Sequence, residues 1–282
     1  MRTTVFDLLK LKQEGRRFAM LTAYDYPSAL IAEAAGVPVL LIGDSMGNVV
    51  HGQGDTLKVT VDDIVRATQS VVRGTQAALI VADMPFLSFR DEATAVANAG
   101  RMMSEGGAGA VKLEGGGSVV SIVGKLVELG IPVMAHLGFT PQSAGTIGLK
   151  VQAKDAEGAR ALIADAEALQ AAGAFALVLE LVPAQLAEEV SRRLHIPVIG
   201  IGAGVGCDAQ VQVWHDLLGL FDGRSPRHAK RYVEAGQILR EAVAAYVTEV
   251  EAGAFPTDAQ SSKKMEDGAL DEALGSVYGS GA

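Results

Sequence analysis

The stretch VLLIGDSMG at residues 39–47 decides the fold, because an apolar run stops abruptly at an acid, a hydroxyl and two glycines. A short apolar run bounded by turn residues is typical of a strand buried on both faces. The stretch LIVADMP at residues 79–85 repeats the pattern and ends its run at Asp83. Parallel sheets hold their ligands at the carboxyl ends of the strands, so Asp44, Ser45 and Asp83 are predicted to face one site.

Strands and helices alternate along the rest of the chain. Apolar runs predict eight strands, at residues 18–23, 39–43, 77–83, 109–115, 131–138, 174–182, 196–202 and 211–218. Helical patterns alternate with them, at residues 5–13, 28–35, 61–73, 92–105, 118–128, 155–172, 183–194 and 227–250. Thr60 is the predicted N-cap of the third of these helices, with Asp63 completing a capping box.

This order predicts an α/β fold, a (β/α)8 TIM barrel, since such barrels have about 250 residues. We expect one catalytic barrel domain over residues 1–256, with an N-terminal helix, and a flexible C-terminal tail over residues 257–282. An open, doubly wound sheet is the alternative. The first predicted strand is not followed by a G-x-G-x-x-G fingerprint, which counts against that alternative.

Composition narrows the function classes. The chain has 282 residues and a net charge of −9, which argues against nucleic-acid binding and leaves small molecules as the expected partners. Cys207 is the only cysteine, so no internal disulfide is possible and a reducing compartment is expected. We find neither a signal peptide nor a run of about 20 apolar residues that would span a bilayer. These observations predict a cytoplasmic protein without a membrane partner.

Charged and polar side chains interrupt or end the predicted strands. The candidate site residues are Asp44, Ser45, Asp83, Lys112, Glu114, His136 and Glu180. Taken singly, a strand-end aspartate is more often a helix cap, and His136 is as well explained by a core histidine as by a ligand-binding one. Taken together they are informative, because buried charges are costly unless they are paired or bound to a metal.

The residue types point to a divalent cation. Asp44, Asp83 and Glu114 offer only oxygen ligands, which favours Mg²⁺ or Mn²⁺ over Zn²⁺. Such an ion keeps positions open for a chelating substrate, and a 2-oxo acid fits because it offers a keto and a carboxylate oxygen. The ion would stabilise an enolate. Glu180 is then the candidate base, and Lys112 would hold the substrate carboxylate or offset the enolate charge.

Six strings occur together and carry a family resemblance. They are GDSMG at 43–47, ADMPF at 82–86, VKLEGG at 111–116, AHLGFTPQS at 135–143, LE at 179–180 and PVIGIGAG at 197–204. On these motifs the chain, over roughly residues 3–256, resembles the ketopantoate hydroxymethyltransferase family, a Mg²⁺-dependent branch of the phosphoenolpyruvate/isocitrate lyase-like barrels.

The resemblance implies a reaction and a set of roles. A hydroxymethyl group passes from 5,10-methylenetetrahydrofolate, the co-substrate, to 3-methyl-2-oxobutanoate, giving 2-dehydropantoate on the route to pantothenate. Matched by motif, Asp44, Asp83 and Glu114 lie at the metal, Glu180 is the proton acceptor, and Ser45 and Lys112 contact the substrate. Asp44, Asp83 and His136 are further candidates for substrate binding, and His136 either orients the substrate or donates a hydrogen bond to the metal site. The resemblance also implies a homo-oligomer, commonly a decamer.

Other interpretations stay open on the sequence alone. The string GIGAG at residues 200–204 is also typical of a phosphate-binding barrel, although its glycines equally permit close backbone packing. Lys112 as a Schiff-base lysine, a carbon–carbon lyase and a catalytically inactive scaffold are further alternatives. The segments 48–60 and 139–154 are candidate lids or ordinary surface loops.

Overall fold

The computed structural model describes residues 2–221, 226–262 and 265–278. The chain divides into two units, Met1–Val233 and Glu234–Ala282, which are described separately. None of the helices in the described residues has the length and apolar character needed to cross a bilayer.

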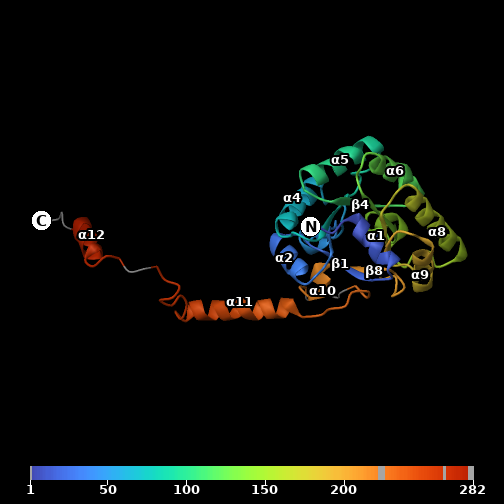
Figure 1. Cartoon of the computed structure of the whole chain (residues 1–282). Coiled ribbons are helices and arrows are strands. Elements are labelled where there is room, and N and C mark those ends of the chain that lie inside the picture. Colours follow the sequence, from blue (N-terminus) through green and yellow to red (C-terminus); the bar gives the residue numbers. More distant parts are fainter. Residues whose placement is uncertain (1, 222–225, 263–264, 279–282) are drawn as a thin grey trace. The chain divides into compact units, whose positions relative to one another are not determined.

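The first unit is built on a closed barrel of eight parallel strands, in which each strand pairs with the next and β8 returns to β1 (Figure 1). This confirms the predicted (β/α)8 fold. The strands are β1 Phe18–Thr22, β2 Val39–Ile42, β3 Leu79–Asp83, β4 Ala110–Glu114, β5 Val133–Gly138, β6 Ala176–Glu180, β7 Val198–Ile201 and β8 Ala209–Gln212.

Helices in the connections between strands surround this barrel in Figure 1, and the helix that precedes the first strand lies over one end of it. They are α1 Val5–Gln13, α2 Tyr26–Ala34, α3 Met46–Val49, α4 Val61–Arg73, α5 Glu92–Ser104, α6 Val120–Glu128, α7 Ala144–Ile147, α8 Ala156–Ala171, α9 Ala184–Arg193 and α10 Trp214–Leu218, with 3-10 turns η1 Gly117–Val119 and η2 Pro141–Ser143. The predicted capping box is present at α4, where the Asp63 amide donates to Thr60 Oγ1 and the Thr60 amide donates to Asp63 Oδ2. The box satisfies two amides that the first helical turn leaves unpaired.

Two apolar layers hold the barrel in place. Alternate strand residues such as Met20 and Leu41 fill the barrel interior, while Leu40 and Ile80 face outward and pack under the helices. Leu8 of α1 is fully buried with the interior layer. Lys12, also on α1, donates to Asp208, just before β8, so α1 lies across the amino ends of the strands. The opposite, carboxyl end is left for the polar residues.

The prediction of the eighth strand at residues 211–218 is wrong. The strand is Ala209–Gln212, and Trp214–Leu218 forms α10. Residues 202–208 join β7 to β8 without a helix, and the outward-facing Gln210 on β8 is exposed. A strand with an uncovered outer face alternates polar and apolar residues, so the search for continuous apolar runs passed over it.

The last predicted helix begins too early. Residues 227–234 are turns and irregular backbone, and α11 spans Ala235–Glu251. The Tyr232 amide donates to the Leu217 carbonyl of α10, and the Arg231 side chain donates to the Phe221 carbonyl. These tertiary bonds take the place of helical bonds in a segment whose sequence is compatible with a helix.

The second unit contains α11 and a further helix, α12 Ala269–Tyr278. The helix α12 falls inside the tail for which the sequence predicted no element. The mobility of the tail and the domain boundary at residue 256 stay predictions, and residues 263–264 and 279–282 of the tail lie outside the described residues.

Candidate active site

The carboxyl ends of five strands bring the predicted residues together. Asp83, Glu114 and Glu180 are the last residues of β3, β4 and β6, and Asp44 follows β2 by two positions. The strand register places Asp83 opposite Lys112 and Glu114 opposite His136. Because the barrel is closed, residues that are more than 130 positions apart in the sequence share one end of it.

A line of contacts joins β2, β3 and β4. Lys112 Nζ donates to Asp83 Oδ1 over 2.7 Å, and the Asp44 amide donates to Asp83 Oδ2 over 3.2 Å. Lys112 Nζ also lies 3.8 Å from Glu114 Oε1. All four residues are buried, with at most 5% of each exposed. A lysine and three carboxylates are therefore taken out of water as one cluster.

His136 lies between two acids. Its Nδ1 is 3.4 Å from Glu114 Oε1, and its Nε2 is 3.5 Å from Glu180 Oε2. The ring is 2% exposed, yet neither nitrogen makes a hydrogen bond of good geometry within the described residues. A buried histidine of the core normally has hydrogen-bond partners for its ring nitrogens. The unpaired nitrogens of His136 therefore favour a ligand-binding role over a purely structural one.

The acids differ in how they titrate. Burial, and then repulsion from Asp83 and Glu114, raises the pKa of the Asp44 carboxyl to about 8. Burial, and then repulsion from Glu114, raises the pKa of Glu180 to about 8 as well. Burial acts to raise the pKa of Glu114 too, but His136 and Lys112 outweigh it and hold that pKa below its usual value. Asp44 and Glu180 therefore have pKa values close to neutral pH, where a carboxyl group readily gains or loses a proton.

Lys112 stays charged. Burial acts to lower the pKa of its ammonium, but the surrounding carboxylates, Asp83 first, outweigh burial and hold the pKa above its usual value. A Schiff-base lysine needs a depressed pKa, because only the neutral amine attacks a carbonyl. The alternative of a Schiff-base enzyme therefore finds no support in this cluster.

Ser45 is half-buried at the start of α3, and its Oγ lies 2.9 Å from the hydroxyl of Tyr24. Tyr24 follows β1, and its ring lies 5.5 Å from that of His215 on α10. Sequence reasoning missed Tyr24. The only signal for it was its position directly after a strand, within a run of residues that also contains Asp25 and Tyr26.

Gln142 is the second residue that the sequence did not single out, although it lies inside the string HLGFTPQS. Its Nε2 donates to Asp44 Oδ2 and to the Met84 carbonyl, each over 3.0 Å, and its backbone amide donates to Glu114 Oε2 over 3.1 Å. The residue is 7% exposed. It ties the loop after β5 to the ends of β2, β3 and β4.

The donor set fits a divalent cation bound by few protein ligands. Asp44 and Asp83 supply carboxylate oxygens, and Glu114 Oε1 is buried without a hydrogen-bond partner. Within residues 2–221, 226–262 and 265–278, no three His, Cys, Asp or Glu side chains are arranged so as to hold a metal ion between them. Mg²⁺ suits such a site, because it is commonly held by one or two carboxylates together with waters and substrate oxygens.

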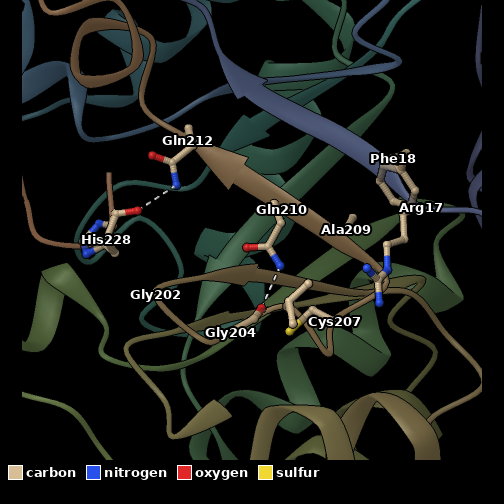
Figure 2. Close-up of a pocket in the computed structure, with 10 residues that line it drawn as sticks. Arg17, Phe18, Gly202, Gly204, Cys207, Ala209, Gln210, Gln212 and His228 are labelled. Carbon is tan, nitrogen blue, oxygen red and sulfur yellow. Dashed lines mark hydrogen bonds between the residues drawn. The ribbon is translucent and has the colours of Figure 1, made fainter. Parts of the chain in front are cut away.

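The glycines after β7 are explained by packing. A Cβ at Gly202 would lie 2.8 Å from Leu181, and one at Gly204 would clash with Ala184. Both glycines line a cavity of about 400 Å³ between the start of β1, β8 and the loop after β7, where Gln210 donates to the Gly204 carbonyl (Figure 2). None of the seven candidate site residues lines this cavity.

A closed parallel barrel with four carboxylates, a lysine and a histidine at the carboxyl ends of its strands defines a barrel enzyme with its active site at that end. The chain belongs to the ketopantoate hydroxymethyltransferase family, whose model matches residues 2–258. The resemblance that the sequence motifs carry is confirmed.

Relatives are similar in sequence over nearly the whole chain. A protein of Gluconacetobacter diazotrophicus is 61% identical over 95% of this chain and 97% of its own length, and one of Roseiflexus sp. is 56% identical over 97% and 99%. Both are named 3-methyl-2-oxobutanoate hydroxymethyltransferase.

Solved structures support the fold alone. A 2,3-dimethylmalate lyase, described as a PEP mutase/isocitrate lyase superfamily member, has a TM-score of 0.59 at 17% identity and covers 100% of both chains. A phosphonopyruvate hydrolase in complex with oxalate and Mg²⁺ has a TM-score of 0.59 at 14% identity and covers 99% of both.

Proposed function

We propose that this chain transfers a hydroxymethyl group from 5,10-methylenetetrahydrofolate to 3-methyl-2-oxobutanoate, with Glu180 as the base that opens the reaction. The names of relatives at 61% and 56% identity support the activity. The observation that carries the mechanism is the environment of the Glu180 carboxyl. Its pKa is raised to about 8, and it lies 3.5 Å from His136, at the edge of the buried cluster that contains Lys112 and Asp83.

The substrate is held by groups of both charges. Lys112 and the Ser45 hydroxyl would receive the carboxylate of the 2-oxo acid, since an ammonium and a hydroxyl both donate hydrogen bonds to it. His136 has unpaired ring nitrogens between Glu114 and Glu180 and would direct a hydrogen bond to the substrate. The substrate then enters a dry site in which these charges act strongly.

The acids Asp44 and Asp83 would hold a divalent cation, Mg²⁺ or Mn²⁺, with Glu114 as the third acid beside it. When bound, the cation would draw electron density from the keto oxygen of the substrate and offset the charge of the enolate. Gln142 and Lys112 donate hydrogen bonds to Asp44 and Asp83, which orients the two carboxylates before any ligand arrives.

Glu180 performs the proton transfer. Its carboxylate takes the proton from C3 of 3-methyl-2-oxobutanoate, and the C3–H electron pair forms the double bond of the enolate as the keto π electrons move to oxygen. C3 then attacks the methylene carbon of the folate, which is bound to N5 and N10. Both carbon–nitrogen bonds break, water supplies the hydroxyl of the new hydroxymethyl group, and the two folate nitrogens take up the proton from C3 and the second proton of the water. The products are 2-dehydropantoate and tetrahydrofolate. A base with a pKa near the working pH suits such a step.

We extend the proposal to the setting of the enzyme. Family resemblance supports a homo-oligomer, namely a decamer. The single Cys207 supports a reducing, cytoplasmic location, and the net charge of −9 argues against nucleic-acid partners.

Solvent deuterium exchange at C3 of 3-methyl-2-oxobutanoate tests the proposal. The wild-type protein should exchange this proton in D₂O with Mg²⁺ and lose exchange on chelation, and Glu180→Gln should lose it in the presence of Mg²⁺. Glu128→Gln, an exposed surface change at the end of α6, is the control and should exchange normally. If the folded protein shows no exchange at C3 either with or without tetrahydrofolate, the assignment of 3-methyl-2-oxobutanoate as substrate is rejected and a lyase is favoured.

A further inference from the structure

The segments that follow β2, β3 and β5 at the carboxyl end of the barrel are joined by one neutral side chain, that of Gln142. The residue comes from η2, directly after the loop that follows β5. Through its side chain it reaches Asp44 after β2 and the Met84 carbonyl after β3, and through its backbone amide it reaches Glu114 at the end of β4. No other neutral side chain is described as bonding to two of the candidate carboxylates or their loops in this way.

The orientation of the amide follows from its partners. Asp44 Oδ2 and the Met84 carbonyl are both acceptors, so both must face the NH₂ group of Gln142, which has two hydrogens to donate. The carbonyl oxygen Oε1 must therefore face the other way. Oε1 is buried and has no partner among the described residues. A buried acceptor normally has a donor, which here must come from a bound water or ligand.

Asp44 and Glu114 are buried carboxylates that need hydrogen-bond donors, and Gln142 supplies them. Asp44 and Glu114 are each 4–5% exposed, and like charges in such a place repel each other. Hydrogen bonds from an uncharged donor hold carboxylates in position without adding a competing positive charge. Groups that hydrogen-bond metal-ligating carboxylates typically affect metal affinity about 10–100-fold when they are changed.

We propose that Gln142 is a positioning residue for the cation site: its side-chain amide fixes the orientation of the Asp44 carboxylate, beside the bond from its backbone amide to Glu114, and its Oε1 accepts a hydrogen bond from a water of the bound cation. The inference rests on the proposed function, because it needs a divalent cation at these acids. In this role Gln142 acts on the cation through the carboxylate that it orients and not on the reacting atoms.

Direct Mn²⁺ binding to the purified full chain, without substrates, tests the role. Gln142→Met keeps the length of the side chain but removes the amide, and should weaken Mn²⁺ binding about 10–100-fold, as read by electron paramagnetic resonance and calorimetry. The spectrum of bound Mn²⁺ should also change, because its ligand geometry is altered. Ser143→Ala, an exposed neighbour in the same turn, is the matched control and should bind as the wild type does.

A second variant guards against a merely structural effect. Gln142→Asn keeps the amide but is shorter by one methylene, so it cannot reach Asp44 and Met84 together and should also lose affinity, with thermal unfolding recorded for every variant. Raised Mg²⁺ should restore the turnover of both variants, because the catalytic groups are intact. If folded Gln142→Met or Gln142→Asn binds Mn²⁺ with wild-type affinity and an unchanged spectrum, the inference about Gln142 is overturned, while the proposed function stands. A wild-type protein that binds no Mn²⁺ would instead overturn the cation site of the proposed function.

Discussion

Cation binding to this site should release protons, because Asp44 holds one at neutral pH. The pKa of its carboxyl is raised from the usual 3.8 to about 8 by burial and by repulsion from Asp83 and Glu114. A cation needs the ionised carboxylate, so below pH 8 it must displace the proton. Each unit of pH below 8 then lowers the apparent affinity about tenfold, or about 1.4 kcal/mol. Between pH 8 and pH 6 the loss from Asp44 is about 100-fold.

The pKa of Asp83 is also raised, again through burial, so Asp83 adds to the pH dependence in the same direction. Glu114 does not, because its pKa is held below the usual value. Calorimetric titration with Mg²⁺ at pH 6, 7 and 8, in buffers of different ionisation enthalpy, measures both the affinity and the number of protons released. Asp267→Asn, at an exposed position, should follow the wild-type profile. An affinity that stays level from pH 6 to pH 8, with no proton release, would refute the reasoning.

Two further predictions concern single contacts. Tyr24→Phe removes the hydroxyl that lies 2.9 Å from Ser45 Oγ, and the loss of about 1 kcal/mol should raise KM for the 2-oxo acid about fivefold with little change in kcat; a fall in kcat at constant KM would contradict a positioning role for Tyr24. Glu33 accepts three backbone hydrogen bonds, from Gln76, Ala77 and Ala78, which outweigh its burial and lower its pKa. A lowered pKa contributes stability above the usual value of 4.5 that is lost as the pH falls. Glu33→Gln should therefore lower Tm at pH 7 by about 2–4 °C, and the difference should shrink in acid; an equal Tm at pH 7 would contradict this.

The barrel was accessible from sequence because most of its strands are buried on both faces. Continuous apolar runs such as LIVAD, residues 79–83, predict strands of this kind, and glycine and proline mark their ends. A strand whose outer face is not covered by a helix lacks such a continuous apolar run. In β8, Gln210 and Gln212 alternate with Ala209 and Val211, and the apolar residues that follow belong to a helix.

Some residues of the candidate site can be predicted from the sequence, and others cannot. Carboxylates at strand ends are conspicuous because burying a charge is costly, so Asp44, Asp83, Glu114 and Glu180 could be selected from the sequence. Gln142 could not, since an amide in a loop is ordinary in any sequence. Its importance depends on three partners that lie 28, 58 and 98 positions away in the chain. Only the closed barrel brings these positions together.

The charge balance of the cluster connects the cation with the base. Four carboxylates face one ammonium, and without a cation the site relieves their repulsion by keeping protons on Asp44 and Glu180, whose pKa values are both raised to about 8. Repulsion from Asp44, Asp83 and Glu114 contributes to the raised pKa of Glu180. A cation beside those three acids would offset that repulsion, so it would lower the pKa of Glu180 and leave the carboxylate ionised at neutral pH. The base would thus be ready to accept the C3 proton only once the metal site is filled, which is why exchange at C3 should depend on both Mg²⁺ and Glu180.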